Sequence, residues 1–312
     1  MSKENMTNSV FLDHLESGDP EMIKTASEAV NDFTRLRLRE DGFLRKIIPP
    51  VPISNNELDR QVDTDKPVKV VDKEPNSPAA ITVPFGTNPM SRYIRGPRYR
   101  VMFARIMTPR FVKDVTELRT YNMDIRQVIS DNAIKDMLAE EDTKFIYAVN
   151  SCLVGAGQTN PDTGVVQWTG TSLGVTRETL VESTKVMSKT PAHLEPNTAL
   201  INTITIKDVM KFHRDEAGGD MAQDILVKGF TEKTLLGINF ITTIKTDIVP
   251  TNTVFYFAEP KFLGKHYTLE DATMFMDKRA FMIEFFAYEE FGASIGNTAA
   301  VTRFDWSNGG SY

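Results

Sequence analysis

The feature that most constrains this chain is a long segment, residues 54–109, through which prolines recur. They are Pro67, Pro75, Pro78, Pro84, Pro89, Pro97 and Pro109. Proline lacks the amide hydrogen that a helix needs and biases its predecessor toward extended structure, so we expect no helix here. Extended runs at 68–71, 80–85 and 99–107, with turn residues at 73–78 and 86–89, predict a long antiparallel hairpin. A compact domain seldom contains roughly 50 residues of such chain, so we expect an arm that gains its burial from a neighbouring subunit.

Helices are predicted on both sides of this arm. Asp19 and the proline after it are typical of a helix start, and apolar residues at three-and-four spacing continue to about Arg39. The same spacing predicts the main helix over 124–153, and we expect the acidic residues that begin at position 140 to break or kink it. We expect Glu-Glu-Asp at 140–142 to be a solvated face rather than a cation site, because adjacent helical positions do not converge on one ion.

The C-terminal half mixes helices and strands, which predicts an α+β fold. Helices are expected over 176–188 and 207–213, and strands over 165–168, 197–206, 235–244, 253–257 and 280–288. In the last of these strands, apolar residues at every second position predict a sheet with one strongly apolar side. These alternating residues are Phe281, Ile283, Phe285 and Ala287.

Composition excludes several classes of protein. The chain has 312 residues with 36 Lys and Arg against 42 Asp and Glu, a net charge of −6, which argues against a protein that coats DNA non-specifically. The single cysteine, Cys152, excludes a disulfide framework and a multi-cysteine zinc site, and the four histidines are too scattered to predict a metal cluster. No secretion signal or membrane-length apolar run is present, so we expect a soluble protein without cofactor or metal.

Three motifs typical of enzymes lack the context that they need. The sequence G-x-S-x-G at 292–296 makes Ser294 a candidate nucleophile, but no histidine follows it. His-Arg-Asp at 213–215 lacks the partner motifs of a kinase, and Gly-Ala-Gly at 155–157 follows a helix instead of a strand. We therefore expect no enzyme, and a soluble serine hydrolase that uses Ser294 is the alternative from another class of function.

A run of basic residues begins within the arm. From position 92 to 126 it carries a net charge of +6 in a chain whose total is −6. Arginine forms bidentate pairs with carboxylates at interfaces, so a chain divided this way suits contacts between copies of itself. The alternatives are nucleic-acid contact and an ordinary exposed face. Our candidates for intersubunit contacts are Arg92, Arg95, Arg98, Arg100, Arg105 and Arg110.

The order of these parts resembles the major capsid proteins of tailed bacteriophages, which have the HK97-like fold. In both, a helical arm is followed by a long hairpin, a long helix and an α+β region that ends in apolar strands, here over residues 20–306. Local segments similar to family segments are 141–157, 197–202, 235–240 and 287–292. The resemblance implies an N-terminal arm with a helix, an extended hairpin (E-loop), a P domain with the spine helix, an A domain, and a C-terminal strand that returns to the P domain. Their boundaries are 1–53, 54–110, 111–196, 197–279 and 280–312.

The resemblance also implies a structural function. The protein is expected to self-assemble into hexamers and pentamers of an icosahedral head that encloses double-stranded DNA without sequence specificity. It is expected in the virion, after assembly in the host cytoplasm, with portal, scaffold or decoration proteins as partners and no membrane. Some family members crosslink a hairpin lysine to a neighbour; Lys66, Lys69 and Lys73 lie in the corresponding region, where we expect ordinary solvated lysines. An encapsulin-like shell around a protein cargo is the alternative within the fold.

Overall fold

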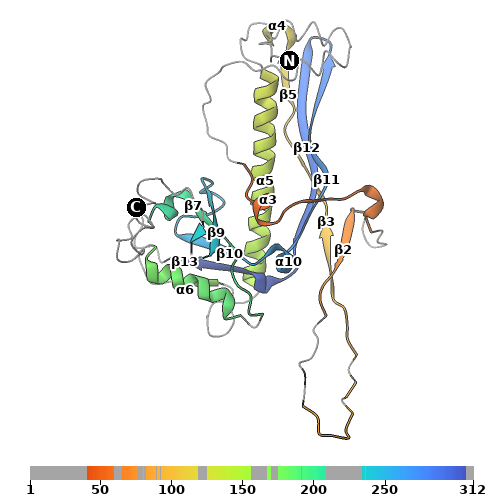
Figure 1. Ribbon diagram of the computed structural model, residues 1–312. Helices are drawn as coiled ribbons and strands as arrows, with labels where there is room; N and C mark the ends of the chain where they lie inside the picture. The colour runs from red at the N-terminus through yellow and green to blue at the C-terminus, as the bar shows by residue number, and fades with distance from the viewer. Residues whose placement is uncertain are drawn as a thin grey trace, which may run out of the picture.

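The computed structural model describes most of the chain after residue 40, and the account below is confined to that part. The described residues are 41–59, 65–75, 80, 82–88, 90–91, 93–118, 125–155, 167–169, 175–190, 192–208, 234–235 and 237–306. The expected helix over 19–39, the His-Arg-Asp motif and Arg92 lie outside them. Figure 1 shows a long helix beside two long strands, a second sheet at one end of that helix, and a hairpin that projects away from both.

The long helix is α5, Ile125–Gly155, with 31 residues. Its position confirms the main helix predicted from the apolar spacing. The expected break at residues 140–143 is wrong, because the helix continues through them without interruption. At 1.5 Å per residue it is roughly 46 Å long, which lets one element contact both sheets.

The first sheet lies along α5 and is built on the hairpin that β11 and β12 form. Strand order is β1-β11-β12-β4, and β5 also pairs with β12. The bounds are β1 Val51–Pro52, β4 Ala104–Met107, β5 Phe111–Asp114, β11 Gly264–Arg279 and β12 Met282–Ile295. The predicted strand at 280–288 is confirmed and is longer than expected, and its partner β11 was not predicted. Ile283, Phe285 and Ala287 are buried, as the alternation predicted, but the prediction is wrong for Phe281, which precedes β12 and is 77% exposed.

The second sheet packs against the C-terminal half of α5, and its strand order is β6-β13-β10-β7-β9-β8. The strands are β6 Gln167–Thr169, β7 Thr198–Asn202, β8 Thr234–Leu235, β9 Ile238–Thr243, β10 Thr253–Phe257 and β13 Val301–Asp305. Two helices accompany it, α6 Arg177–Ser188 and α7 Thr203–Ile206. The strand predicted over 197–206 is wrong after Asn202, whose side chain caps α7 by accepting a hydrogen bond from Ile204 N at 2.8 Å.

The projecting hairpin confirms the antiparallel pairing predicted within the proline-rich segment. Strands β2, Val68–Asp72, and β3, Arg98–Met102, pair antiparallel from Val68↔Met102 to Asp72↔Arg98. Toward the tip, Gly86 has φ of 87°, a left-handed conformation that glycine adopts without strain. Thr87 N closes this turn by donating to Pro84 O at 3.2 Å. The one helical turn in the described part of residues 54–109 is the short 3-10 helix Asn55–Glu57.

Two short helices complete the junctions between these parts. Helix α3, Leu44–Ile47, packs on α5, and α10, Pro260–Leu263, leads into β11. The larger core joins α3, the C-terminal half of α5, α6 and the six-stranded sheet, and a smaller one joins α5 to β4 and β12. Within the described residues, no helix is long and apolar enough to cross a membrane. The domain boundaries implied above stay a prediction.

Candidate assembly surfaces and a buried junction

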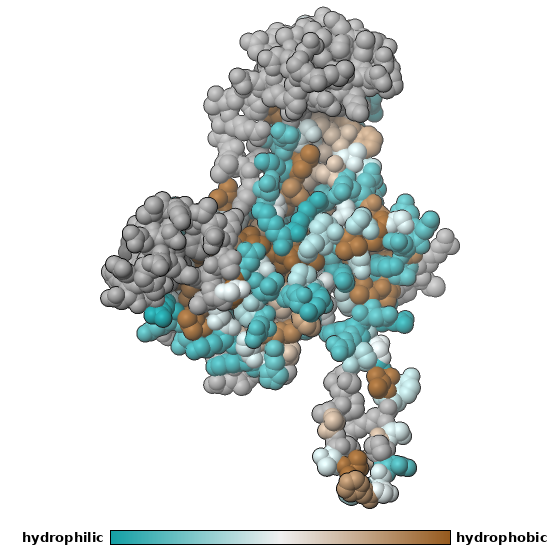
Figure 2. Space-filling model, in the orientation of Figure 1, coloured by the Kyte–Doolittle hydropathy of each residue, from teal (hydrophilic) through white to brown (hydrophobic). Residues whose placement is uncertain are grey.

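The far end of the hairpin carries apolar side chains in full contact with solvent. Phe85, Met90 and Tyr93 are exposed to 109%, 85% and 90%. Figure 2 shows hydrophobic side chains at this tip, well separated from the body of the molecule. Exposed aromatic groups of this size are typical of an interaction site.

The predicted arginines fall into two groups. Three form ion pairs within the chain: Arg98 with Asp72 at 2.8 Å, Arg105 with Glu290, and Arg110 with Glu284 at 3.6 Å. Arg95 and Arg100 lie on the exposed surface of the hairpin. The role of these residues between subunits stays a prediction.

Two of these arginines also lie on an aromatic row that the sequence did not reveal. Phe275 of β11 stacks on Phe286 and Tyr288 of β12, with ring centroids 5.5 and 5.3 Å apart. Arg105 lies over Tyr288 at 5.5 Å, and Arg110 lies over Phe286 at 5.4 Å. Because side chains alternate along β12, this row is on the face of the sheet opposite to Phe285, which is buried. The basic run therefore continues onto an aromatic outer face.

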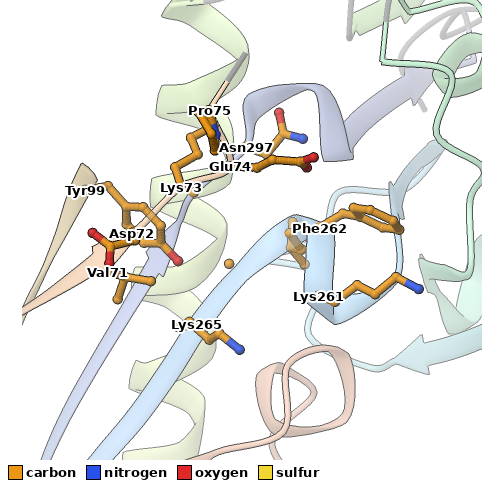
Figure 3. A pocket seen from close by; sticks show the side chains of 13 residues that line it. Val71, Asp72, Lys73, Glu74, Pro75, Tyr99, Lys261, Phe262, Lys265 and Asn297 are labelled. Carbon is orange, nitrogen blue, oxygen red and sulfur yellow. The ribbon is translucent and has the colours of Figure 1, made fainter. Parts of the chain in front are cut away.

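A cavity of about 400 Å³ lies where the hairpin meets the body. Figure 3 shows Asp72, Lys73 and Tyr99 on the hairpin side, opposite Phe262 and Lys265. Its lining mixes acidic, basic and aromatic groups. Burial raises the pKa of the Tyr99 hydroxyl. The cavity therefore lies at the base of the hairpin, where the hairpin joins the body.

Ser294 does not have the geometry of a nucleophile elbow. It lies within β12, opposite Lys265 of β11, whereas the elbow needs a sharp strand-to-helix turn. His266, the histidine on the neighbouring strand, pairs with Ala293. Since successive residues of a strand point to opposite faces, His266 and Ser294 are on opposite faces of the sheet.

Residues 141 and 142 of α5 form a buried charged junction, and the expectation of a solvated face there is wrong. Glu141 and Asp142 are both fully buried. Asp142 accepts hydrogen bonds from the backbone N–H groups of Phe43, at 3.1 Å, and Leu44, at 2.9 Å. Lys245 Nζ, from the segment after β9, donates to its other oxygen at 2.6 Å. Burial raises the pKa of Asp142, although Lys245 and these N–H groups lower it.

Arg45 of α3 occupies the other half of the junction. Its Nε and Nη2 each donate to Glu141 at 3.2 Å, and Nη2 also donates to Glu289 of β12. Asp271 of β11 accepts from Nη1 at 3.4 Å at the solvent-exposed edge. One arginine therefore connects α3 to the long helix and to both long strands.

Two buried side chains of the junction, His266 and Glu289, each have one polar atom without a hydrogen-bond partner within the described residues. His266 Nδ1 lies 3.4 Å from Ile48 O, while its Nε2 lies 4.0 Å from Glu141. Burial lowers the pKa of this imidazole, so it is neutral at pH 7. Within the described residues, His266 Nε2 and Glu289 Oε2 have no hydrogen-bond partner. In the same part of the chain, no group of three His, Cys, Asp or Glu side chains is arranged to hold a metal ion.

The sequence did contain a signal for this junction. Positions 141 and 142 lie four residues after Met137 and Leu138 and four before Phe145 and Ile146, so they continue the apolar face of α5. Acids on an apolar face are buried with partners. Those partners are up to 244 residues away in sequence, which spacing alone does not reveal.

Comparison with known proteins identifies the fold. No protein-family model and no curated protein matches the chain. Among solved structures, the mature capsid of bacteriophage PhiM1 has a TM-score of 0.62 at 9% identity, covering 90% of this chain and 92% of that one. The capsid of an empty GTA particle has a TM-score of 0.62 at 16% identity, covering 89% and 94%. The capsid of cyanophage P-SCSP1u has a TM-score of 0.58 at 9% identity, covering 89% and 91%. The chain therefore has the HK97-like fold of phage capsid proteins.

Proposed function

We propose that this protein is the structural shell protein of a phage-like head. Copies of it assemble into hexamers and pentamers of an icosahedral shell that encloses double-stranded DNA without reading its sequence. The observation that carries this proposal is the similarity to capsid structures over about nine tenths of this chain and of theirs. The place of action is the virion, and the partners are other copies of the chain together with portal, scaffold or decoration proteins.

The hairpin supports this function because it is unsuited to a protein that acts alone. Phe85 and Tyr93 are left uncovered by the described part of the chain, and contact with another molecule would bury them. Repeated around a closed shell, a hairpin that lies on the next copy gives every copy the same contact, as point-group symmetry requires. Burial of such a tip makes the stability of the subunit depend on assembly.

The arginines support the same function through their remaining hydrogen-bond donors. A guanidinium has five N–H donors, so the pairing of Arg98 with Asp72 leaves donors for a carboxylate on a second copy. Arg95 and Arg100 are exposed on the same hairpin. We therefore retain the hairpin arginines as intersubunit contacts.

Electron microscopy tests the proposal directly. The protein, purified from its source or expressed with and without its scaffold, is expected to form closed shells or capsomers. A monodisperse monomer under all of these conditions contradicts it. The contents of the shells separate the two kinds of particle: packaged DNA supports a phage-like head, whereas a protein cargo supports an encapsulin-like compartment.

A further inference from the structure

Within the described residues, the junction around α3 contains one more buried carboxylate than the cations that contact it. Glu141, Asp142 and Glu289 are all fully buried, and the cations that contact them are Arg45 and Lys245. An ionised carboxylate without a counter-charge is expensive to bury, so a buried site with this imbalance favours binding a proton. Asp271 at the exposed edge adds further negative charge.

The hydrogen bonds indicate which carboxyl group holds the proton. Glu141 receives two bonds from Arg45, and Asp142 receives bonds from Lys245 and two backbone N–H groups. Glu289 receives one bond, from Arg45, and its second oxygen has no partner within the described residues. Glu289 therefore receives the fewest hydrogen bonds of the three carboxylates, and it is the one that binds the proton.

The groups that stabilise this arrangement belong largely to the α3 segment. Arg45 is the donor to Glu289, the Phe43 and Leu44 amides bind Asp142, and Ile48 O faces His266. In Figure 1 this segment runs from α5 toward the two long strands. Release of α3 would remove Arg45 and admit water to Glu289, so docking and protonation are linked.

We propose that this junction is a proton-controlled latch: the α3 segment docks tightly while Glu289 holds a proton, and loosens as Glu289 gives that proton up. The latch acts on the segment through which the N-terminal residues join the body. It lies within one subunit and does not depend on the proposed shell.

The pH range follows from the two states of Glu289. Burial, followed by the neighbouring Glu141 carboxylate, raises its pKa from 4.5 to about 8 when α3 is docked. Once α3 is released, water restores the ordinary value. A group whose pKa is higher in the docked state favours docking fully below its ordinary pKa and loses this contribution as pH rises to the docked value. Docking therefore weakens from about pH 4.5 to about pH 8 and then levels off.

Two other groups of the junction, His266 and Asp142, also have shifted pKa values. Burial lowers the pKa of His266 from 6.5, so its protonation loosens the junction only in acid. Burial raises the pKa of Asp142 from 3.8, so it acts in the same direction as Glu289. Arg45, Glu141 and Asp271 are the charged groups that face Glu289 within the described residues, and Lys245 binds the neighbouring Asp142. Glu289, with a pKa of about 8, titrates in the interval from pH 7 to pH 8, and its substitution separates its contribution from those of the other groups.

Hydrogen–deuterium exchange of the unassembled full-length chain tests the latch. The exchange rates of backbone amides 43–48 are compared with those of the β10 amides. Both are first corrected for the intrinsic dependence of amide exchange on pH. With a docked pKa of about 8, a one-proton linkage predicts that opening of α3 increases about fivefold from pH 7 to pH 8 in the wild type. Glu289→Gln, which resembles the protonated acid, is expected to remove this increase. Glu290→Gln is the matched control: Glu290 pairs with Arg105 on the outer face, and the increase should persist.

Two results overturn the latch. One is a wild-type chain in which α3 and β10 respond alike between pH 7 and pH 8, a result that needs no variant. The other is a Glu289→Gln chain with the same increase as the wild type. Both are read inside one subunit, so neither depends on whether shells form.

Discussion

At the scale of single residues, the neighbouring acids Glu141 and Asp142 of α5 have different roles. Asp142 acts as a cap for another helix, because its carboxylate binds the free N–H groups at the start of α3. Glu141 binds the guanidinium of Arg45, the next residue of the same short helix. Four residues of helix have little stability by themselves, so these two side chains hold α3 in place as much as its buried Leu44 does.

Replacing Asp142 tests this role. Asp142→Asn keeps the size of the side chain but removes the charge that binds Lys245, whose side chain is only 13% exposed. Breaking a buried ion pair leaves the partner uncompensated, so we expect the free energy of unfolding to fall by about 3 kcal/mol. Denaturant unfolding of the unassembled chain measures it. Glu140→Gln, one residue earlier and exposed, is the control and should change stability by less than about 0.5 kcal/mol. Equal effects of the two substitutions contradict the role.

At the scale of secondary structure, elements were predictable where local sequence determines them. Helix α5 follows from its apolar spacing, and the hairpin follows from prolines that exclude a helix over residues 54–109. Strand β11 escaped prediction because the residues it buries are partly polar. His266 and Thr268 lie at buried positions of β11, so its alternation does not have the apolar pattern of β12.

The tip of the hairpin is the element whose function is most directly testable. Phe85→Ser with Tyr93→Ser removes two exposed aromatic groups without changing charge. If the tip is buried on a neighbouring copy, shells should disappear from electron micrographs, because aromatic anchors supply much of the energy of an interface. The circular dichroism of the subunit should be unchanged. Tyr147→Ser, at a position 76% exposed on α5, is the control and should still form shells. Normal shells from the double variant contradict docking of the tip.

At the scale of the whole molecule, the charged junction is bound within the subunit, whereas the hairpin tip is exposed to solvent. The charged junction fixes α3 to the long helix and to the long strands, with partners between 96 and 244 residues apart. Such distant pairings depend on the completed fold, which explains why sequence patterns identified the elements but not this site. The hairpin, in contrast, extends away from both cores with its apolar tip exposed (Figures 1 and 2). In the described part of an isolated subunit, the hairpin tip therefore has no contacts that bury it, whereas α3 is already bound by the junction.

The charge of the hairpin provides the last test of assembly. The triple variant Arg95→Glu, Arg98→Glu, Arg100→Glu reverses exposed charges and breaks the exposed ion pair between Arg98 and Asp72. Exposed pairs contribute at most about 1 kcal/mol, so the subunit should stay folded by circular dichroism. Shell closure should nevertheless fail, because like charges placed against acidic groups on the next copy repel them. The matched control changes the same three arginines to lysine, which keeps the charge, and should still close shells. Normal shells from the reversed variant would show that these arginines face solvent in the assembly and that contacts other than charge hold the hairpin in place.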